Sequence, residues 1–551
     1  MQGFDFAVAD IETDPFKEWV TADQQRIPKA FAAGIRYKDQ EWIYWGPDCL
    51  TKIVAKAKTL GVPVYMHNGG NFDFHFLLPF INPLKCVFLM IGGKRIVSIQ
   101  LPGKDAPQFR DSYALVPIPL ASWQKDKIDI RRLEPEVREK HWVGIARYLS
   151  GDLRGLQSLM TAAHNRMEGD HLTQASNAFA KLRKSLPEKL PKISEHFDRK
   201  FRPFYYAGRV QAFRKGRIPG QWDAYDINSA FPHSMCSLHW WGAGHVSQSA
   251  EPKAHREQCF YELTCDAAGC FPLRSKDKVE YPIGRHRFNV TGWELLKARE
   301  LGLVDNEEIH WVHIPSELMS YDDFILPLYD EKKDAEALGD SGRRLFIKLE
   351  MNSSYGKFAE SPDSHRDVIC VKIFTKPKRD PKDRNRNPWV HCYDDEENGY
   401  SFWQRDVHGD FGSKPKIFRN VAIAASITGK VRATLMEAIH KGGAVYCDTD
   451  SVFVPAGTQG FETGTGLGQW KHEFTFRELH IGGRKLYAGR GRDPAKPQAP
   501  MKWKTAAKGV RMTPRDIVEV CKGNTVTSRF AAPSFSLLAG TRFISRRVRM
   551  V

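Results

Sequence analysis

The sequence lacks the features that mark secreted, membrane-spanning and zinc-binding proteins. None of its ten cysteines forms a CxxC pair, and the one cluster, Cys259, Cys265 and Cys270, does not match the common spacings of zinc ligands. We therefore interpret the cysteines as free thiols in a reducing compartment. The N-terminus, MQGFDFAVADIE, has no basic segment before an apolar core, so we expect no signal peptide. No apolar run is long enough to cross a bilayer, and these absences predict a cytoplasmic protein that does not contact a membrane.

Acidic residues are fewer than basic ones. The 551 residues include 65 Asp and Glu against 82 Lys and Arg, which gives a formal net charge of +17. The excess is spread along the chain, which favours a long polyanion as partner over a small acidic substrate. Charge alone would equally fit a basic protein whose charge serves only solubility. The hydrophobic fraction of 42% indicates a globular chain, and its length predicts several hydrophobic cores.

The N-terminal part of the chain has an α/β pattern. Alternation from Phe4 to Glu12 predicts a strand, and a second strand over 62–66 runs into a Gly-rich turn. From about 130 to 190 the pattern is helical and charged. This region ends in KSLPEKLPKI, which predicts a domain boundary.

The rest of the chain combines short strands with long helices. We predict a strand over 222–227, helical structure over 330–357, and a helix over 421–441 that ends at Gly442-Gly443. That helix leads into a hairpin, AVYCDTDSVFV. Between the two helical segments, KPKRDPKDRNRNP predicts an exposed basic loop, which could grip phosphates or simply be solvated.

The first group of acidic residues lies in the N-terminal region. Asp10 and Glu12 sit two apart on a predicted strand, so both side chains leave the same face. Asp73 follows the turn in HNGGNFDF, and Tyr148 and Asp152 lie four apart on one helix face in RYLSGDL. The DxE pair alone would best fit an exposed strand end. Together, the four carboxylates could converge on two metals, with the Tyr148 hydroxyl orienting an attacking water.

A second group follows in the C-terminal two thirds. Asp226 ends a predicted strand in AYDINSAFP, and Asp448 and Asp450 lie at the tip of the predicted hairpin. Each alone would fit a turn carboxylate. A strand-end Asp facing a DxD hairpin can instead bind two magnesium ions, hard cations that prefer oxygen ligands. Such ions hold a triphosphate and lower the barrier for in-line attack by a primer 3′-OH.

A third segment, RRLFIKLEMNSSYGKF, suits a nucleotide. Lys348, Asn352 and Tyr355 fall at i, i+4 and i+7, on one helix face. We interpret Lys348 as a phosphate ligand and Tyr355 as a ring that stacks on the base, with Gly356 letting a template approach. A core-facing amphipathic stripe is excluded, because Lys and Asn occupy the positions that a core would fill with apolar residues.

In order, these segments resemble the motifs of family B DNA polymerases. DIET, HNGGNFD and YLSGD resemble the three exonuclease motifs, and AYDINSAFP, KLEMNSSYG and YCDTDS resemble motifs A, B and C. The resemblance covers nearly the whole chain. It implies a DNA-directed DNA polymerase with 3′→5′ proofreading, two Mg²⁺ or Mn²⁺ per active site, and DNA template, primer and dNTPs as partners of a monomer. The implied fold is α/β plus α+β: a ribonuclease-H-like exonuclease domain followed by a right-hand palm, fingers and thumb.

The family motifs also imply roles for individual residues. The synthesis metals would be bound by Asp226 and Asp450 with help from Asp448, and the editing metals by Asp10, Glu12, Asp73 and Asp152. Nucleotide contacts are implied for Ile227, Phe231, Lys348, Asn352, Tyr355 and Lys333, with Lys332 as the alternative to Lys333. Contacts to the single-stranded primer end are implied for Thr13, His67, Asn68, Phe72, Ser112 and Lys127, with Lys125 as the rival of Lys127. Other DNA contacts are implied for Tyr205, Ala207 and Gly208 of a YxGG-like motif, Gly356, Lys485 and Tyr487 of a KxY motif, Lys504 and Lys508.

Two departures from the family motifs matter. Phe231 stands where most members have Tyr in motif A. A Phe ring can still exclude a 2′-OH, so we predict that DNA is preferred over RNA. Ala207 replaces the first Gly of the YxGG motif, and because Ala is still small, close backbone approach to the template survives.

The short chain and the intervals between its motifs resemble those of the protein-primed branch. Short sequence stretches around the motifs are most similar to those of tectivirus-type phage polymerases. Such an enzyme would start on a terminal protein, copy a linear viral or plasmid genome in the host cytoplasm, and displace the second strand. Primer-independent family B polymerases are the alternative, and an exonuclease or DNA-binding protein with a silent polymerase half is a more distant one. The expected division is exonuclease 1–188, palm 189–238 and 418–488, terminal-protein insertion 239–322, fingers 323–357, duplex-wrapping insertion 358–417 and thumb 489–551.

Overall fold

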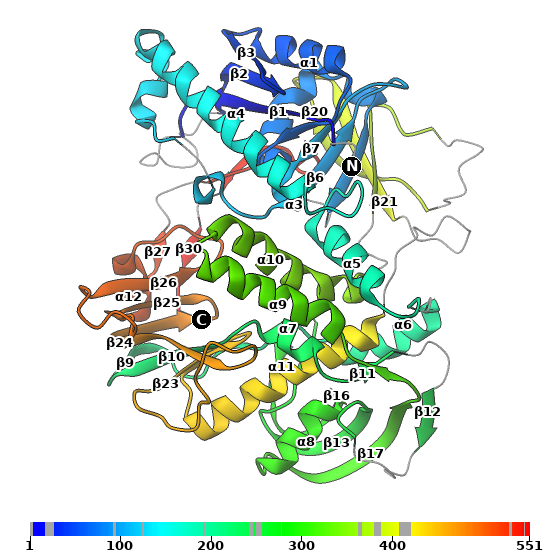
Figure 1. The fold of residues 1–551 in the computed structure, drawn as a ribbon, viewed down its shortest axis with the longest axis vertical. Coiled ribbons are helices and arrows are strands. Elements are labelled where there is room, and N and C mark those ends of the chain that lie inside the picture. The colour runs from blue at the N-terminus through cyan, green and yellow to red at the C-terminus, as the bar shows by residue number, and fades with distance from the viewer. Residues whose placement is uncertain are drawn as a thin grey trace.

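The chain folds into an N-terminal α/β unit above a second, larger sheet, with a helical hairpin between them (Figure 1). The computed structural model describes residues 4–16, 27–91, 95–123, 126–190, 193–241, 246–249, 256–276, 278–361, 366–378, 387–406, 420–527, 532–544 and 546–550. None of the helices within these ranges has both the length and the apolar character needed to cross a bilayer. All ten cysteines are free thiols, as predicted.

The N-terminal unit is built on a seven-stranded mixed sheet. In spatial order its strands are β3 (Gln40–Trp45), β2 (Ala30–Tyr37), β1 (Ala7–Thr13), β4 (Val64–Met66), β7 (Gln108–Asp111), β6 (Arg95–Gln100) and β5 (Val87–Ile91). β1 pairs antiparallel with β2 and parallel with β4. Helix α1 (Cys49–Leu60) packs against β2, and α4 (Trp142–His164) packs against β1 and β2. The helical region predicted for 130–190 is confirmed by α4 and α5 (Gln174–Ser185).

The two faces of β1 belong to different cores. Val8 packs in the core on the α4 side, whereas Ala9 and Ile11 pack on the α1 side. Because side chains alternate along a strand, Asp10 and Glu12 leave the strand toward α4.

The predicted start of the first strand was wrong. β1 begins at Ala7 rather than Phe4, because its partner β2 ends at Tyr37. Phe4 and Phe6 instead pack against the ring of His164, with centroid separations of 4.3 and 4.8 Å. The predicted second strand is also shorter, since β4 starts at Val64.

The second unit is an eight-stranded sheet. Its main path runs β26 (Lys502–Ala507), β25 (Leu486–Arg492), β24 (Trp470–Gly483), β10 (Trp222–Ile227), β23 (Ser451–Pro455), β22 (Tyr446–Asp448) and β8 (Val210–Ala212), and β9 (Gly216–Ile218) pairs with β24. Helix α11 (Val421–Gly442) packs against β23 and ends at Gly443, whose φ is +63°. The predicted strand, helix and hairpin are therefore confirmed. Tyr225 and Ile227 face α11, so Asp226 lies on the opposite face of the sheet.

Two helices, not one, occupy the region predicted as helical over 330–357. They are α9 (Asp322–Ala337) and α10 (Ser341–Ser354). The chain turns at Gly339, with φ of +68°, and Asp340 caps α10 by accepting a hydrogen bond from the Arg343 amide at 2.9 Å. Tyr355 lies just beyond α10, in the 3₁₀ turn η9 (Tyr355–Ala359). In Figure 1 the α9–α10 hairpin lies between the N-terminal unit and the second sheet.

Two smaller sheets interrupt the second unit. Strands β12 (Val246–Ser249), β17 (Val304–Pro315), β13 (Phe260–Ala268) and β16 (Ile283–Thr291) form one sheet, in that order, and β16 leads into α8 (Gly292–Glu300). The other sheet consists of β19 (Arg366–Lys372), β21 (Tyr400–Asp406) and β20 (Val390–Asp395). Its residues Cys370 and Phe402 join Leu537 of the C-terminal segment in the core of the N-terminal unit. Most of the predicted basic loop, 379–386, lies outside the described residues.

Candidate active sites

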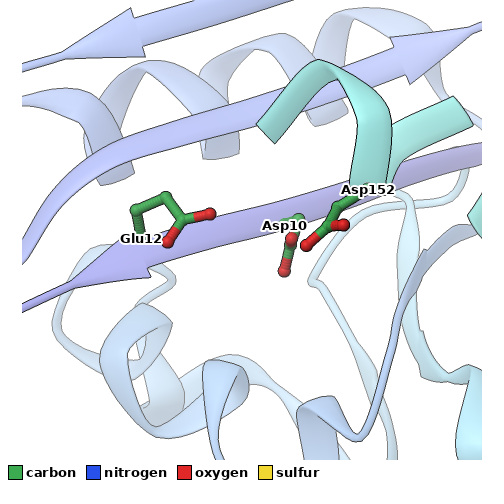
Figure 2. Close-up of side chains that lie close together, drawn as sticks. All are labelled: Asp10, Glu12 and Asp152. Carbon is green, nitrogen blue, oxygen red and sulfur yellow. The ribbon is translucent and has the colours of Figure 1, made fainter. Parts of the chain in front are cut away.

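The first carboxylate site forms where α4 crosses β1. Asp10 and Glu12 rise from the same strand and Asp152 reaches them from α4 (Figure 2). Their ligand atoms all lie within 4.8 Å of one another, and Glu12 and Asp152 are buried. Buried carboxylates this close repel unless a cation lies between them. The donor set therefore fits a hard divalent cation.

Asp73 approaches from a separate element. It is the first residue of α2 (Asp73–Leu77) and is buried, but it is not part of the three-carboxylate group. A turn with Asn68 at φ +60° leads into it. A Cβ on Gly70 of that turn would lie 1.7 Å from the Ile96 carbonyl oxygen, so only glycine fits there. Tyr148 is half-buried one turn before Asp152, on the same helix as predicted.

Several residues predicted to bind a single-stranded primer end contact other groups of the protein. His67 Nδ1 lies 2.9 Å from Ser112 Oγ, and His67 Nε2 lies 3.0 Å from the Ile118 carbonyl oxygen. Ser112 is completely buried, so in this structure its hydroxyl holds His67 rather than facing solvent. Its expected contact to a primer end stays a prediction.

The remaining members of that set are more variable in exposure. Thr13 is buried and donates a hydrogen bond to the Asp14 carbonyl at 3.3 Å. The Asn68 side-chain oxygen accepts a hydrogen bond from the side-chain amide of Asn71 at 2.8 Å. The Phe72 ring packs 5.3 Å from Phe535 of the C-terminal segment. Lys127 is exposed, and its rival at position 125 lies outside the described residues.

The second carboxylate site lies on the larger sheet, where β10 meets the β22–β23 hairpin. Asp226 pairs with Ser451 across the sheet, and the Ile227 amide donates to the Asp450 carbonyl at 2.9 Å. Burial, followed by the nearby Asp450 and Glu473 charges, raises the pKa of Asp226 to about 7. Burial is also the main cause that raises the pKa of Asp450 to about 6. A bound cation would favour the ionised form of both groups.

Asp448, the third carboxylate of this site, is held by the KxY segment. Lys485 Nζ lies 2.7 Å from both Asp448 carboxylate oxygens. The Tyr446 hydroxyl donates to the same carboxylate at 3.4 Å. Tyr487 packs edge-on against Tyr446 with a centroid separation of 5.4 Å. The lysine predicted to contact a primer is therefore ion-paired to a predicted metal ligand.

Glu473 on β24 is a member of this site that the motifs did not reveal. Its charge raises the pKa of both Asp226 and Asp450, although burial and the charge of a neighbouring aspartate contribute more. Lys504, expected near the duplex backbone, pairs with Glu473 at 3.0 Å. The only signal in the sequence was a carboxylate two residues from Lys471, the residue that pairs with Asp226 across the sheet.

The predicted nucleotide contacts meet beside these carboxylates. The rings of Phe231 and Tyr355 stack on each other, with centroids 4.3 Å apart and planes 16° apart. Lys348 and Asn352 are exposed on α10, and the Lys348 charge opposes the rise in the Asp226 pKa. Ile227 is buried in the core beneath the site, so its side chain cannot contact a nucleotide here.

The two lysines of α9 that were candidates for a nucleotide contact have different partners. Lys332 Nζ donates to the Ser229 hydroxyl, at 3.3 Å, in the turn after Asp226. Lys333 lies 3.9 Å from Asp330 and over the Tyr329 ring. Lys332 Nζ also lies over the Tyr329 ring, 5.1 Å from its centroid, so the hydrogen bond to Ser229, and not the ring contact, distinguishes the two lysines.

The YxGG-like segment packs against the β22–β23 turn. A Cβ on Gly208 would lie 2.7 Å from Thr449 Cγ2, between the two aspartates of the hairpin. The Ala207 carbonyl accepts a hydrogen bond from Arg432 at 3.2 Å, and the Tyr205 carbonyl accepts one from Arg274 at 3.2 Å. Gly356 is exposed with open space around its Cβ position, as its predicted role requires.

A basic groove of about 830 Å³ extends from Lys485. Elements from the second sheet, the β14–β15 hairpin (Leu273–Ser275 and Lys278–Glu280) and the C-terminal segment line it. Its cationic residues are Lys215, Lys278, Arg484, Lys485, Lys508, Arg546, Arg547 and Arg549. Such a lining attracts a phosphate backbone.

The sequence is similar to those of known DNA polymerases. Residues 124–387 match a family described as DNA polymerase type B, organellar and viral. The chain is 30% identical to the DNA-directed DNA polymerase of Enterobacteria phage PRD1, over 99% of this chain and 98% of that protein. The chain belongs to the protein-primed family B DNA polymerases. A DNA polymerase of Kluyveromyces lactis is 22% identical over 87% of this chain and 57% of its own length.

The structure of this family B polymerase matches solved structures over its full length. Phi29 DNA polymerase complexed with primer-template DNA superposes with a TM-score of 0.77 at 18% identity, covering 99% of this chain and 100% of that chain. Its complex with primer-template DNA and incoming nucleotides superposes with a TM-score of 0.73 at 17% identity, covering all of both chains. The predicted architecture is therefore confirmed: an exonuclease domain followed by palm, fingers and thumb.

Proposed function

We propose that this DNA-directed DNA polymerase also proofreads, starts on a terminal protein and displaces the second strand while it copies a linear viral or plasmid genome. The single observation that carries the proposal is the pair of separate carboxylate sites. One lies on β1 under α4, and the other lies on β10 and the β22–β23 hairpin. The donors of both sites fit two Mg²⁺ or Mn²⁺ each.

Synthesis takes place at the second sheet. Asp226 and Asp450, with Asp448, would hold the metals, which would activate the primer 3′-OH and neutralise charge on the triphosphate. Lys348 and Lys332 orient the phosphates from the α9–α10 hairpin. The stacked Phe231 and Tyr355 rings form the wall against which the sugar and base rest, and this wall excludes a ribose 2′-OH. Gly356 and the Gly208 segment guide the template.

Editing takes place under α4. Asp10, Glu12 and Asp152 would hold metal, and Asp73 would complete the set from α2. The Tyr148 hydroxyl orients the attacking water. Phe72 and His67 hold the primer end, with Ser112 fixing the His67 ring through their hydrogen bond, and Thr13, Asn68 and Lys127 as further contacts.

The DNA path joins the two sites. The basic groove that starts at Lys485 binds the duplex backbone, including through Lys508. Because the editing and synthesis carboxylates sit on different sheets, the primer end must melt and move between them. The protein acts as a monomer in the host cytoplasm, with the domain division given above.

The two inserted sheets supply priming and strand displacement. The four-stranded sheet has a core of its own around Leu263, Phe288 and Val312, and we assign it to the terminal protein. The three-stranded sheet packs on the exonuclease core and, through Tyr393, against Gly540 of the C-terminal segment. Exonuclease domain, insertion and C-terminal segment are therefore in continuous contact, which suits a ring around DNA.

Primer extension on a template that carries a blocking duplex tests this function. Wild type should extend through the duplex, and Asp450→Ala should lose extension while it still degrades 3′ ends. A labelled dNMP should also become covalently attached to the terminal protein. Wild type that degrades but extends no primer, with or without the terminal protein, would instead favour an exonuclease with a silent polymerase half. Synthesis on bare single strands without any primer would favour the primer-independent alternative.

A further inference from the structure

A buried charge network joins the exonuclease domain to the fingers helices. Glu350 lies on α10 with its side chain only 1% exposed. Its carboxylate accepts hydrogen bonds from Arg166 Nη2 at 2.9 Å and from Lys181 Nζ at 2.5 Å. Arg166 follows α4 and Lys181 lies on α5, so both cations come from the exonuclease side of the molecule.

Arg166 also holds the other helix of the hairpin. Its Nη1 and Nη2 atoms lie 2.9 and 3.2 Å from the two carboxylate oxygens of Glu331 on α9. Arg343 of α10 adds a contact to Glu331 at 2.8 Å. One planar guanidinium therefore fixes α9 and α10 at once, a geometry that Lys could not reproduce.

The two carboxylates are placed next to the residues assigned to the nucleotide. Glu331 precedes Lys332, and Glu350 lies between Lys348 and Asn352. On α10 the buried Glu350 faces the exonuclease domain, whereas Lys348 and Asn352 are exposed. Any rotation or shift of the hairpin on Arg166 would move both lysines relative to the carboxylates of the synthesis site.

We infer that Arg166, through Glu331 and Glu350, is a positioning residue that sets the triphosphate-binding geometry of the fingers from the exonuclease domain. This inference rests on the proposed nucleotide role of the α9–α10 hairpin. The alternative is that the network contributes only to stability. Apolar contacts across the same interface argue against that, because Phe346 is buried and packs 5.7 Å from Trp123, so the helix is attached without the charges. A buried ion pair that adds little net stability can still specify geometry.

The test compares steady-state dNTP incorporation and 3′ degradation by full-length variants. Glu350→Gln should raise KM for dNTP about ten-fold, because small misplacements of binding groups are costly, with kcat and degradation close to wild type. Arg166→Lys, which keeps the charge but loses the fork, should be intermediate. The control is Glu336→Gln, which removes an exposed α9 carboxylate that lies 3.6 Å from Arg344 of the same hairpin and whose charge also acts on Lys332.

Four results would overturn the inference. In the first, Glu336→Gln raises KM as much as Glu350→Gln does, which would point to a general field effect. In the second, Glu350→Gln lowers kcat, degradation and melting temperature together and leaves KM unchanged, which would point to stability alone. Should Glu350→Gln not fold, Glu331→Gln is judged by the same criteria. In the third, Lys348→Ala leaves KM for dNTP unchanged, which would remove the nucleotide assignment of the hairpin and this inference with it. A raised KM in Lys348→Ala but not in Glu350→Gln would refute the inference alone.

Discussion

Gly70→Ala should abolish editing and leave synthesis intact. The added Cβ would sit 1.7 Å from the Ile96 carbonyl oxygen and 2.8 Å from an Asp111 carboxylate oxygen, whereas real Cβ contacts stay above 3.0 Å. Ile96 lies on β6, which is held between β5 and β7, so the turn must yield rather than the sheet. That turn leads directly into Asp73.

A displacement of about 1 Å at a catalytic group costs on the order of 100-fold in rate. We therefore expect 3′→5′ degradation of a labelled single strand to fall about 100-fold in Gly70→Ala, with primer extension within two-fold of wild type, since the second sheet is untouched. Gly144→Ala is the matched control, because it lies in α4 with nothing within 4 Å of its Cβ position. Degradation at the wild-type rate by Gly70→Ala would refute the assignment of the turn, and an equal loss of extension would refute the separation of the two activities.

Three further predictions concern the synthesis site and the segments that pack around it. Glu294→Gln leaves the buried Arg432 without its carboxylate partner, 2.7 Å away. It should lower the free energy of unfolding by about 3 kcal/mol in urea titrations. A loss of stability under about 1 kcal/mol would contradict this prediction. Burial and the Asp450 charge raise the pKa of Asp226 from 3.8 to about 7, so in chelator the folded protein binds more protons than the unfolded chain and loses stability as pH rises through that interval. Asp226→Asn should therefore melt higher than wild type at pH 8, without this advantage at pH 4, and equal melting at both pH values would count against it. Phe231→Ala should raise ribonucleotide incorporation about ten-fold relative to deoxyribonucleotide incorporation, and no change would exclude the ring as the barrier to a 2′-OH.

Sequence periodicity predicted which residues of the first carboxylate site share a face. Asp10 and Glu12 share a strand face, and Tyr148 and Asp152 share a helix face, because both periods are local. The structure brings Asp10, Glu12 and Asp152 together. Asp73 could not be placed in this way, since its position depends on a turn shaped by a contact with Ile96 on another strand.

The surroundings of the synthesis site depended on contacts between distant segments. The strand ending at Asp226 and the hairpin with Asp448 and Asp450 follow from local pattern, and the structure confirms them. The choice of Lys332 over Lys333 depends on how α9 is rotated, which the break at Gly339 and the Arg166 contacts determine. No local sequence pattern predicts the rotation of α9 or the Arg166 contacts, because the contacting residues lie far apart in the sequence.

The stacking of Phe231 on Tyr355 shows the same limit. Motifs A and B indicated that both rings lie near a nucleotide, but not that they pack on each other at 4.3 Å. Glu473 was missed because a single carboxylate on a long strand has no distinctive spacing. In each case the missing information was the relative placement of two elements rather than their type.

The central claim is that one chain holds two active sites that work independently. The most direct test measures extension and degradation by the same preparation of wild type and of Asp10→Ala combined with Asp73→Ala. We predict that the double variant extends a primer at nearly the wild-type rate and degrades no 3′ ends. Loss of both activities in a folded double variant would contradict the account, because it would mean that the carboxylates under α4 also serve synthesis.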